Sequence, residues 1–459
     1  MEAAAHVLLF PWPLQGHINC MLHLAAGLLD AGLHVTFLHT HHNLRRLAPP
    51  PSGSRLRLLS IPDGLPDDHP RSVARLRDLM ESMQTTASAA YRALLLESDA
   101  VTCVVADGIM PFAVDVAEEV GVPAIAFRTA SACSFLAYLS VPRLLQLGEV
   151  PSTSDQPVRA VPGMEGFLRR RDLPRRPRTD AAGFDPMLLT IAEGISHSGN
   201  ARALILNTSV SMEPVALAHI ARQMRDVFAV GPLHAHASSC TSRTGSTASL
   251  WREDDGCIAW LDGHQDRSVV YVSLGSLTVI SEEQLAEFLS GLTAAGYAFL
   301  WVLRPDMIAG GITTLPALKR LGGEKARVVE WAPQRDLLRH RAVGCFLTHA
   351  GWNSTLEAAG EGVPMVCWPF FADQLINSRF VSSVWRTGVD MKDVCDRAVV
   401  ERMVRHAMES AEMRTTAHAM AQQLRLDIAD GGSSSSELKR LVTFIADLSR
   451  SAPNNQRSL

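Results

Sequence analysis

The sequence predicts an α/β protein made of two doubly wound, Rossmann-like domains that face each other across a cleft. Short aliphatic runs alternate with longer helical patterns along most of the 459 residues. Such continuous apolar runs are typical of parallel strands that are buried on both faces. The chain is also too long for one ordinary core, and its hydrophobic content of 47% is sufficient for two.

The first half contains seven apolar runs that we expect to form strands of one parallel sheet. These expected strands span residues 6–10, 34–39, 56–61, 101–106, 124–127, 203–206 and 227–230. Helical patterns lie between them, most clearly over residues 21–30, 73–97 and 111–119. Alternation of strands and helices predicts a sheet that is covered by helices on both faces.

A change of composition at residues 234–249 predicts a linker between two domains. This stretch is rich in Ser, Thr, Ala and Gly and has no periodicity. We therefore expect an N-terminal domain over residues 1–233, a C-terminal domain over 250–436, and a last helix with a tail over 437–459. The expected strands of the second domain are 268–274, 299–303, 327–330, 343–348 and 365–368, and its clearest helical patterns are 281–295, 353–361 and a tail from 397 to about 448. We expect Gly431, Gly432 and the serines at 433–436 to break that tail into separate helices.

Charge and cysteine content restrict the class of protein. Lys and Arg number 43 and Asp and Glu number 47, so the net charge is −4, which argues against a nucleic-acid or anionic-membrane surface. The eight cysteines form no Cys-x-x-Cys pair and most lie in apolar runs, which favours reduced thiols in a cytoplasmic protein. No run approaches the ~18 apolar residues of a membrane span. We expect a monomer.

Several polar residues follow expected strands in the first half, where ligands bind to parallel sheets. His17 follows the strand at 6–10, and Asp107 follows the strand at 101–106. Taken alone, a capping or hydrogen-bonded loop histidine is the commoner interpretation of His17, whereas an aspartate turn or helix N-cap is the less favoured alternative for Asp107. His39, His41 and His42 also cluster, but no nearby Cys or carboxylate completes a metal shell, so we expect no metal.

The segment from Trp331 to Gln374 carries the strongest signal for a binding site. The expected strand at 343–348 leads through the turn His349-Ala350-Gly351 into a helix from about Asn353. A helix N-terminus that is reached through a glycine turn suits a diphosphate. Ser354 and Glu357 also fit a capping box, which needs no ligand and is the commoner interpretation of that pattern alone.

The same segment closely resembles the signature box of the plant family 1 UDP-glycosyltransferases. The matching pattern is W-x-P-Q, then H-x-G-W-N-S-x-x-E, then P-x-x-x-x-P-x-x-x-D-Q. The match is tight in the second half and scattered between residues 45 and 223. The resemblance implies a GT-B fold, with an acceptor-binding domain over 1–233, a UDP-sugar-binding domain over 250–436, and a last helix and tail over 437–459 that pack back on the N-terminal domain.

The resemblance implies a role for each residue near the uridine. Trp331 would stack on the uracil ring through its flat face. The backbone of Ala332 and the side chain of Gln334 would face the edge of the uracil. Glu357 would accept hydrogen bonds from the two ribose hydroxyls, a use of a carboxylate that is also seen in dinucleotide sites.

The diphosphate and hexose are assigned in the same way. His349, Asn353 and Ser354 would hold the diphosphate, and Ser276 would lie over the phosphates from the end of the strand at 268–274. Backbone N–H groups and neutral side chains would thus stabilise the negative charge of the diphosphate without a metal cation. The sequence contains no Asp-x-Asp motif that would bind such a cation.

Donor choice depends on three residues that would surround the hexose, namely Trp352, Asp373 and Gln374. In the family, glutamine at the end of the box is associated with glucose and histidine with galactose. An arginine at the position of Trp352 would pair with a glucuronate carboxylate. The resemblance therefore implies UDP-glucose as co-substrate, with no further cofactor.

The resemblance also implies the catalytic pair. The family places its general base in a Gly-His dipeptide such as Gly16-His17, and its histidine-orienting aspartate matches Asp107. A hydroxyl acceptor is a poor nucleophile until a base takes its proton, which an imidazole can do at neutral pH. Attack opposite the leaving UDP would give a β-glucoside of a small hydrophobic acceptor, such as a phenolic, a terpenoid or a hormone-like metabolite.

Other interpretations are weighed against this one. A dinucleotide oxidoreductase would need G-x-G-x-x-G after the first strand, which is absent, as is a P-loop. A catalytically weak UDP-sugar-binding module, or the same fold with another UDP-sugar, stays an alternative. Plausible walls of the acceptor pocket are Phe112, Phe127, Ala132, Phe135, Leu136 and Met187, although core packing explains each of them equally well.

Overall fold

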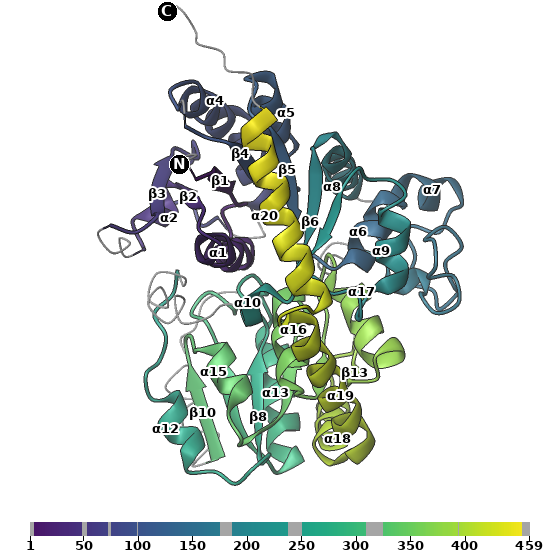
Figure 1. Ribbon diagram of the computed structural model, residues 1–459. Coiled ribbons are helices and arrows are strands. Elements are labelled where there is room, and N and C mark those ends of the chain that lie inside the picture. Colours follow the sequence, from purple (N-terminus) through teal and green to yellow (C-terminus); the bar gives the residue numbers. More distant parts are fainter. Residues whose placement is uncertain are drawn as a thin grey trace, which may run out of the picture. The chain divides into compact units, whose positions relative to one another are not determined.

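The computed structural model describes residues 4–47, 53–71, 75–98, 100–174, 186–236, 250–308, 325–392 and 394–451. The chain falls into two compact units (Figure 1). Unit 1 comprises Met1–Leu139, Thr190–Leu250 and Asp427–Leu459, and unit 2 comprises Ser140–Leu189 and Trp251–Leu426. Most of the predicted linker, residues 237–249, lies outside the described residues, as does the tail from residue 452.

The sheet of unit 1 has seven strands in the order β3-β2-β1-β4-β5-β6-β7. All neighbouring strands pair in parallel, as predicted. The strands are β1 (His6–Phe10), β2 (His34–Thr40), β3 (Leu56–Ile61), β4 (Cys103–Asp107), β5 (Ala124–Arg128), β6 (Ala203–Leu206) and β7 (Val227–Ala229). Because the strand order reverses between β1 and β4, a ligand crevice is expected at the carboxyl ends of these two strands.

The helices between these strands follow the predicted rhythm with shifted bounds. They are α1 (Gln15–Asp30), α2 (His41–Leu44), α3 (Leu76–Ser82), the π-turn η2 (Met83–Ala87), α4 (Ser88–Leu96), α5 (Pro111–Glu119), α6 (Ala132–Leu139), α8 (Pro186–Ser196), η4 (His197–Asn200), α9 (Pro214–Ile220) and α10 (Leu233–His236). The helix that was expected over residues 21–30 already begins at Gln15, so His17 lies in its first turn.

The last helix, α20 (Ser433–Ser451), belongs to unit 1, where Leu441 and Ile445 are buried against the same core as α1 and the sheet (Figure 1). The expectation that the serines at 433–436 break the tail is wrong, because they form the first turn of this helix. Serine suits a helix start, and the Ser434 hydroxyl donates to the Gly231 carbonyl at 2.5 Å. The break lies just before, at Gly431 with its φ of 80°.

The sheet of unit 2 has six parallel strands in the order β10-β9-β8-β11-β12-β13. The strands are β8 (Val269–Ser273), β9 (Ala298–Val302), β10 (Ala326–Val329), β11 (Val343–Thr348), β12 (Met365–Cys367) and β13 (Gly388–Asp390). The edge strand β13 was not predicted, because two of its three residues, Gly388 and Asp390, are of types that are uncommon in strands. The two parallel sheets confirm the predicted α/β fold class.

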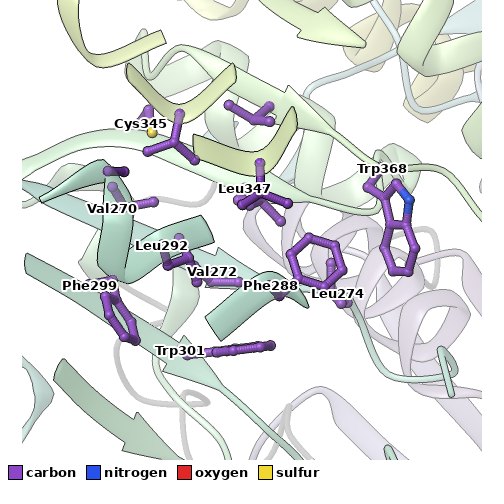
Figure 2. Close-up of a cluster of buried hydrophobic side chains, with 14 of the residues drawn as sticks. Val270, Val272, Leu274, Phe288, Leu292, Phe299, Trp301, Cys345, Leu347 and Trp368 are labelled. Atoms are coloured by element: carbon purple, nitrogen blue, oxygen red, sulfur yellow. The ribbon is translucent and has the colours of Figure 1, made fainter. Parts of the chain in front are cut away.

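The core of unit 2 lies between this sheet and two helices, α13 (Glu282–Ala295) and α18 (Arg397–Glu409). Figure 2 shows the rings of Phe288 and Trp368 side by side in this core, and their centroids lie 4.6 Å apart. The remaining helices are α7 (Val141–Gln146), η3 (Arg170–Asp172), α12 (Cys257–Asp262), α15 (Gln334–Arg339), α16 (Trp352–Glu361), α17 (Gln374–Arg379), the π-turn η6 (Phe380–Val384) and α19 (Ala411–Ile428).

One segment from the first half of the sequence, Ser140–Leu189, belongs to unit 2. Its buried Asp172 forms ion pairs with Lys392 and Arg169, and the Arg379 side chain donates to the Phe167 carbonyl at 3.0 Å. The Arg379 contact joins this segment to α17, and the Lys392 contact joins it to the residues after β13. Strand and helix patterns do not indicate this connection. Among the described residues, no helix is both long enough and apolar enough to cross a membrane.

The contact between α13 and α18 depends on a glycine. A Cβ at Gly291 would lie 2.6 Å from the Arg397 carbonyl oxygen and 2.6 Å from the Cβ of Val400. Gly291→Val should therefore lower the free energy of unfolding of unit 2 by about 1–3 kcal/mol, the usual cost of overpacking. Urea unfolding measures this loss. The control Ala286→Val, at an exposed position of the same helix, should have a much smaller effect; equal losses would contradict the packing argument.

Candidate functional site

The first candidate site lies at the carboxyl ends of β1, β4 and β5 in unit 1. His17 Nδ1 lies 2.6 Å from an Asp107 carboxylate oxygen, Oδ2, and 3.1 Å from the Thr129 hydroxyl. Asp107 is fully buried, whereas 24% of the His17 side chain is exposed. The structure thus brings the two predicted residues, His17 and Asp107, together. The Nδ1 atom of His17 contacts Asp107 and Thr129, and its Nε2 atom lies on the other side of the ring.

The surroundings of Asp107 favour its ionised form. Burial by itself would raise the pKa of Asp107, but contact with His17, the nearby Arg128 and the backbone N–H of Ile109 together lower it below its usual range. The N–H groups of Trp12 and Ile109 donate to its carboxylate at 3.3 and 3.2 Å. A carboxylate fixed in this way can orient an imidazole and stabilise its protonated form.

Two further residues near this pair were not singled out from the sequence. Thr129 directly follows β5, so the strand-end rule that selected Asp107 could have found it. Arg128 is buried, and a Cβ on Gly108 would lie 2.7 Å from its side chain. Its guanidinium lies 5.7 Å from the centre of the Phe135 ring, in cation–π range.

The histidines at 39, 41 and 42 separate in the structure. His39 is buried at 2% exposure beside the Phe37 ring, with centroids 4.7 Å apart. His41 is exposed and its Nδ1 lies 2.8 Å from the Ser60 hydroxyl. Within the described ranges, no group of three or more His, Cys, Asp or Glu residues is arranged to hold a metal ion.

The second candidate site is the strand, turn and helix at residues 343–361 in unit 2. Strand β11 ends at Thr348, Ala350 adopts a φ of 60°, and Gly351 is the N-cap of α16. The helix therefore begins at Trp352, which places Ser354 in the third helical position. The capping-box alternative for Ser354 and Glu357 is wrong, because Ser354 lies inside the helix and does not cap it. Helix N-termini in general suit anions, because the first backbone N–H groups of a helix have no acceptor within the helix, and the start of α16 is such a position.

His349 lies between two glycines at this turn. A Cβ at Gly275 or at Gly351 would lie 2.3 or 2.4 Å from its Nε2, so neither position leaves room for a side chain. Burial, and secondarily the positive charge of Arg304, lower the pKa of His349 to about 4. The ring is therefore neutral near pH 7, with one N–H to donate.

The Gln334 side chain forms hydrogen bonds with three residues of unit 2. Its Nε2 donates to the Ser354 hydroxyl at 3.0 Å and to the Glu357 carboxylate at 2.6 Å, while its Oε1 accepts from the Tyr271 hydroxyl at 3.1 Å. Burial raises the pKa of Glu357, and the hydrogen bond from Gln334 with the nearby arginines offsets only part of this. Tyr271, on the central strand β8, was not predicted.

Trp331 follows β10 and is partly exposed, and Ala332 beside it is buried. The Trp331 indole stacks on that of Trp251, with centroids 5.8 Å apart and an angle of 21°. The backbone N–H of Asp254 donates to the Trp331 carbonyl at 3.0 Å. This bond holds the backbone that carries Trp331 next to the backbone that follows Trp251. Trp251 was not predicted, because its pairing partner lies far away in the sequence.

The end of the predicted box forms the start of α17. Asp373 is its N-cap residue and accepts from the Asn377 amide at 2.9 Å. The Gln374 side chain is buried, and its Oε1 accepts from the N–H groups of Phe370 and Phe371 at 2.8 and 3.2 Å. These bonds fix the orientation of the amide and leave its NH₂ group as the donor.

The other predicted residues have clear positions but less definite contacts. Trp352 is buried, with its ring 6.2 Å from that of Trp385, while Ser276 and Asn353 are partly exposed. All predicted donor residues belong to unit 2, and His17 and Asp107 belong to unit 1. Of the suggested pocket walls, Phe127, Ala132, Phe135 and Leu136 are buried and Phe112 is partly exposed, whereas the Met187 side chain lies outside the described residues.

Known proteins resemble this chain over nearly its whole length. A family model described as UDP-glucoronosyl and UDP-glucosyl transferase matches residues 242–420. The 7-deoxyloganetic acid glucosyltransferase of Catharanthus roseus is 44% identical and the match covers 97% of this chain and 98% of that protein. The myricetin 3-O-rhamnoside 1,2-glucosyltransferase of Crocosmia x crocosmiiflora is 45% identical, with 98% and 97% covered.

A solved structure has the same overall fold. The crystal structure of Os79 from O. sativa in complex with UDP matches with a TM-score of 0.80 and 28% identity, over 96% of this chain and 100% of that one. The likeness extends over both units, so the order of elements in each half is shared with a protein that binds UDP.

The buried His39 makes stability depend on pH. Burial lowers the pKa of His39 to about 4 from 6.5, so between these values the unfolded chain binds a proton that the folded chain does not. Folding is therefore weakened as pH falls. When the pH is lowered from 7 to 5, the free energy of unfolding of the wild type falls. That of His39→Leu should fall by about 2 kcal/mol less. Urea unfolding at both pH values measures this, and equal losses in the two proteins would refute it.

Proposed function

Because this chain belongs to the plant family 1 UDP-glycosyltransferases, we propose that it transfers glucose from UDP-glucose to a small hydrophobic acceptor. It is a UDP-sugar glycosyltransferase of an inverting family with the GT-B fold, and it acts on small metabolites. The acceptor group is a hydroxyl or a carboxyl, and the products are a β-glucoside and UDP. The 2.6 Å contact between His17 and Asp107 carries this proposal.

In the proposed mechanism, His17 is the general base. Asp107 accepts the Nδ1–H of His17, which leaves Nε2 to take the proton of the acceptor hydroxyl. The acceptor oxygen bonds to C1 of glucose as the bond between C1 and the phosphate oxygen breaks. UDP leaves on the opposite face, so the α-linked donor gives a β-linked product.

In unit 2 we assign the donor residues as the family resemblance implies. Trp331 stacks on the uracil, the backbone of Ala332 and the side chain of Gln334 face the uracil edge, and Glu357 accepts hydrogen bonds from the ribose hydroxyls. The N-terminus of α16 stabilises the negative charge that develops on the departing diphosphate. His349, Asn353, Ser354 and Ser276 supply the neutral donors, so we propose that no metal ion is required.

Gln374 supports glucose as the transferred sugar. Its Oε1 is held by two backbone N–H groups, so its NH₂ group is the one that faces a hexose hydroxyl. Asp373 and Trp352 complete this end of the site. Several relatives of this chain are glucosyltransferases by name, which supports the same choice. Another UDP-sugar, or weak catalysis by a binding module, are the outcomes that would replace this assignment.

Further parts of the proposal concern organisation and location. Acceptor binding is assigned to the N-terminal domain over residues 1–233, and donor binding to residues 250–436. We place the enzyme in the cytoplasm as a monomer, with no nucleic-acid partner. None of the seven cysteines in the described part of the chain forms a disulfide, which supports a reducing compartment.

The function is tested by UDP release from UDP-glucose in the presence of phenols, terpenoid alcohols and carboxylic acids, including 7-deoxyloganetic acid. His17→Ala should lower turnover of a hydroxyl acceptor by at least about 100-fold, because the base is lost. A carboxylic acid is already ionised at pH 7, so its turnover should fall much less. UDP affinity, measured by calorimetry, should stay unchanged.

The matched variant Asp107→Asn keeps the shape of the side chain but loses its charge. It should also lower hydroxyl turnover by about 100-fold or more, since the imidazole loses the group that orients it. Full turnover of a phenol by either variant would remove this pair from the mechanism. Absence of UDP release with every acceptor would favour the binding-module alternative.

Donor choice is tested at the end of the box. Gln374→His should shift the ratio of kcat/KM for UDP-glucose over UDP-galactose toward galactose by about 10-fold or more, because the amide donor is replaced by an imidazole. The control Gln284→His changes a glutamine that caps α13, and it should leave the ratio unaltered. An unchanged ratio in Gln374→His would defeat the assignment.

A further inference from the structure

Arg304 is a buried arginine that lies outside the signature segment. It follows β9 by two residues, its exposed fraction is 1%, and it is among the largest fully buried side chains of the described chain. Its Nε donates to Asp306 at 3.0 Å, and 59% of that aspartate side chain is exposed. Burying a guanidinium is costly unless its N–H groups are satisfied, so such a residue calls for an explanation.

The guanidinium is satisfied by the turn that follows the central strand β8. Arg304 donates to the carbonyl of Gly275 and, at 3.0 Å, to the carbonyl of Thr278. These two residues bracket Ser276, and Gly275 has a φ of 77°. In a trans peptide the C=O and the following N–H point in opposite directions. The N–H of Ser276 is therefore directed away from Arg304.

The same glycine contacts the neutral imidazole of the diphosphate region. A Cβ at Gly275 would lie 2.3 Å from Nε2 of His349, so the ring packs directly on the turn. Arg304, Gly275 and His349 thus form one packed stack between β9, β8 and β11, which are adjacent strands of the sheet. Movement of the turn would displace the ring as well.

Arg304 also brings a permanent positive charge to this position. A guanidinium stays protonated in proteins. Asp306, the only ion-pair partner of Arg304 in the described chain, is screened by solvent. Charges inside a protein act over longer distances than charges in water, because the local dielectric constant is lower. A diphosphate near Ser276 and His349 would be stabilised by this charge.

We propose that Arg304 is a positioning residue for the diphosphate of the donor. It holds the turn at residues 275–278 so that Ser276 and His349 face the phosphates, and it supplies a buried positive charge behind them. This inference rests on the proposed function, because it takes the UDP-sugar site to lie at the start of α16. It adds a residue to that site which neither the sequence nor the family pattern singled out.

The test compares UDP with uridine, which lacks both phosphates. Arg304→Met keeps the bulk of the side chain but removes its charge and its hydrogen bonds. It should weaken UDP binding by at least about 10-fold in calorimetry and change uridine binding, measured by ligand-detected NMR, by less than about 2-fold. The matched control Lys392→Met removes another buried cation of unit 2, which pairs with Asp172 and Asp390; it should leave the ratio of the two affinities as in the wild type.

Asp306→Asn keeps the proposal testable if Arg304→Met does not fold. It removes only an exposed carboxylate and leaves the carbonyl contacts of Arg304 intact. UDP binding should stay as tight as in the wild type or become up to about 2-fold tighter, because less of the buried charge is neutralised. A UDP affinity that falls 3-fold or more in this variant would overturn the inference.

The remaining outcomes separate this inference from the proposed function. Equal losses of UDP and uridine in Arg304→Met, or an unchanged UDP affinity, would overturn the role of Arg304 while the function stands. A wild-type protein that binds neither UDP nor UDP-glucose would overturn the proposed function and the inference together.

Discussion

Parallel pairing of the strands is the constraint on which both candidate sites depend. In the described chain the two sheets have seven and six parallel strands. In each sheet, the carboxyl ends of all strands therefore lie along the same side. Residues that are far apart in the sequence therefore meet there. In unit 1, Asp107 ends β4, Thr129 directly follows β5, and His17 lies in the helix that follows β1. In unit 2 the ends of β8, β9 and β11 bring Gly275, Arg304 and His349 together in the same way.

Buried polar groups restrict the movement of the residues at the carboxyl ends of these strands. Asp107 has no solvent contact, so its carboxylate must be satisfied by His17 and by backbone N–H groups. Gln334 has the same effect in unit 2, where it ties Glu357 to Tyr271 on the central strand. Each of these groups would cost several kcal/mol if it were left without a partner. The hydrogen-bonded networks thus fix geometry as well as contributing to stability.

Long-range connections complete each unit with segments from the other half of the sequence. Helix α20 supplies Leu441 and Ile445 to the core of unit 1, and residues 140–174 attach to unit 2 through Asp172. A network of a buried carboxylate with Arg169 and Lys392 is specific in geometry, since each charge requires its partner. Neither connection follows from local patterns, because the segments involved are hundreds of residues from some of their partners.

The sequence by itself determined the α/β class, the positions of most strands along the chain and the identity of the family. Hydrophobic periodicity is local, and the spacing from Trp331 to Gln374 is a one-dimensional pattern, so both are readable without coordinates. Only the tertiary structure decided that His17 belongs to the first turn of α1, that α16 begins at Trp352, and that Arg304 lies beneath the turn at Gly275. These features depend on contacts between residues of different strands and helices. The energies of such contacts cannot be inferred from a short stretch of sequence.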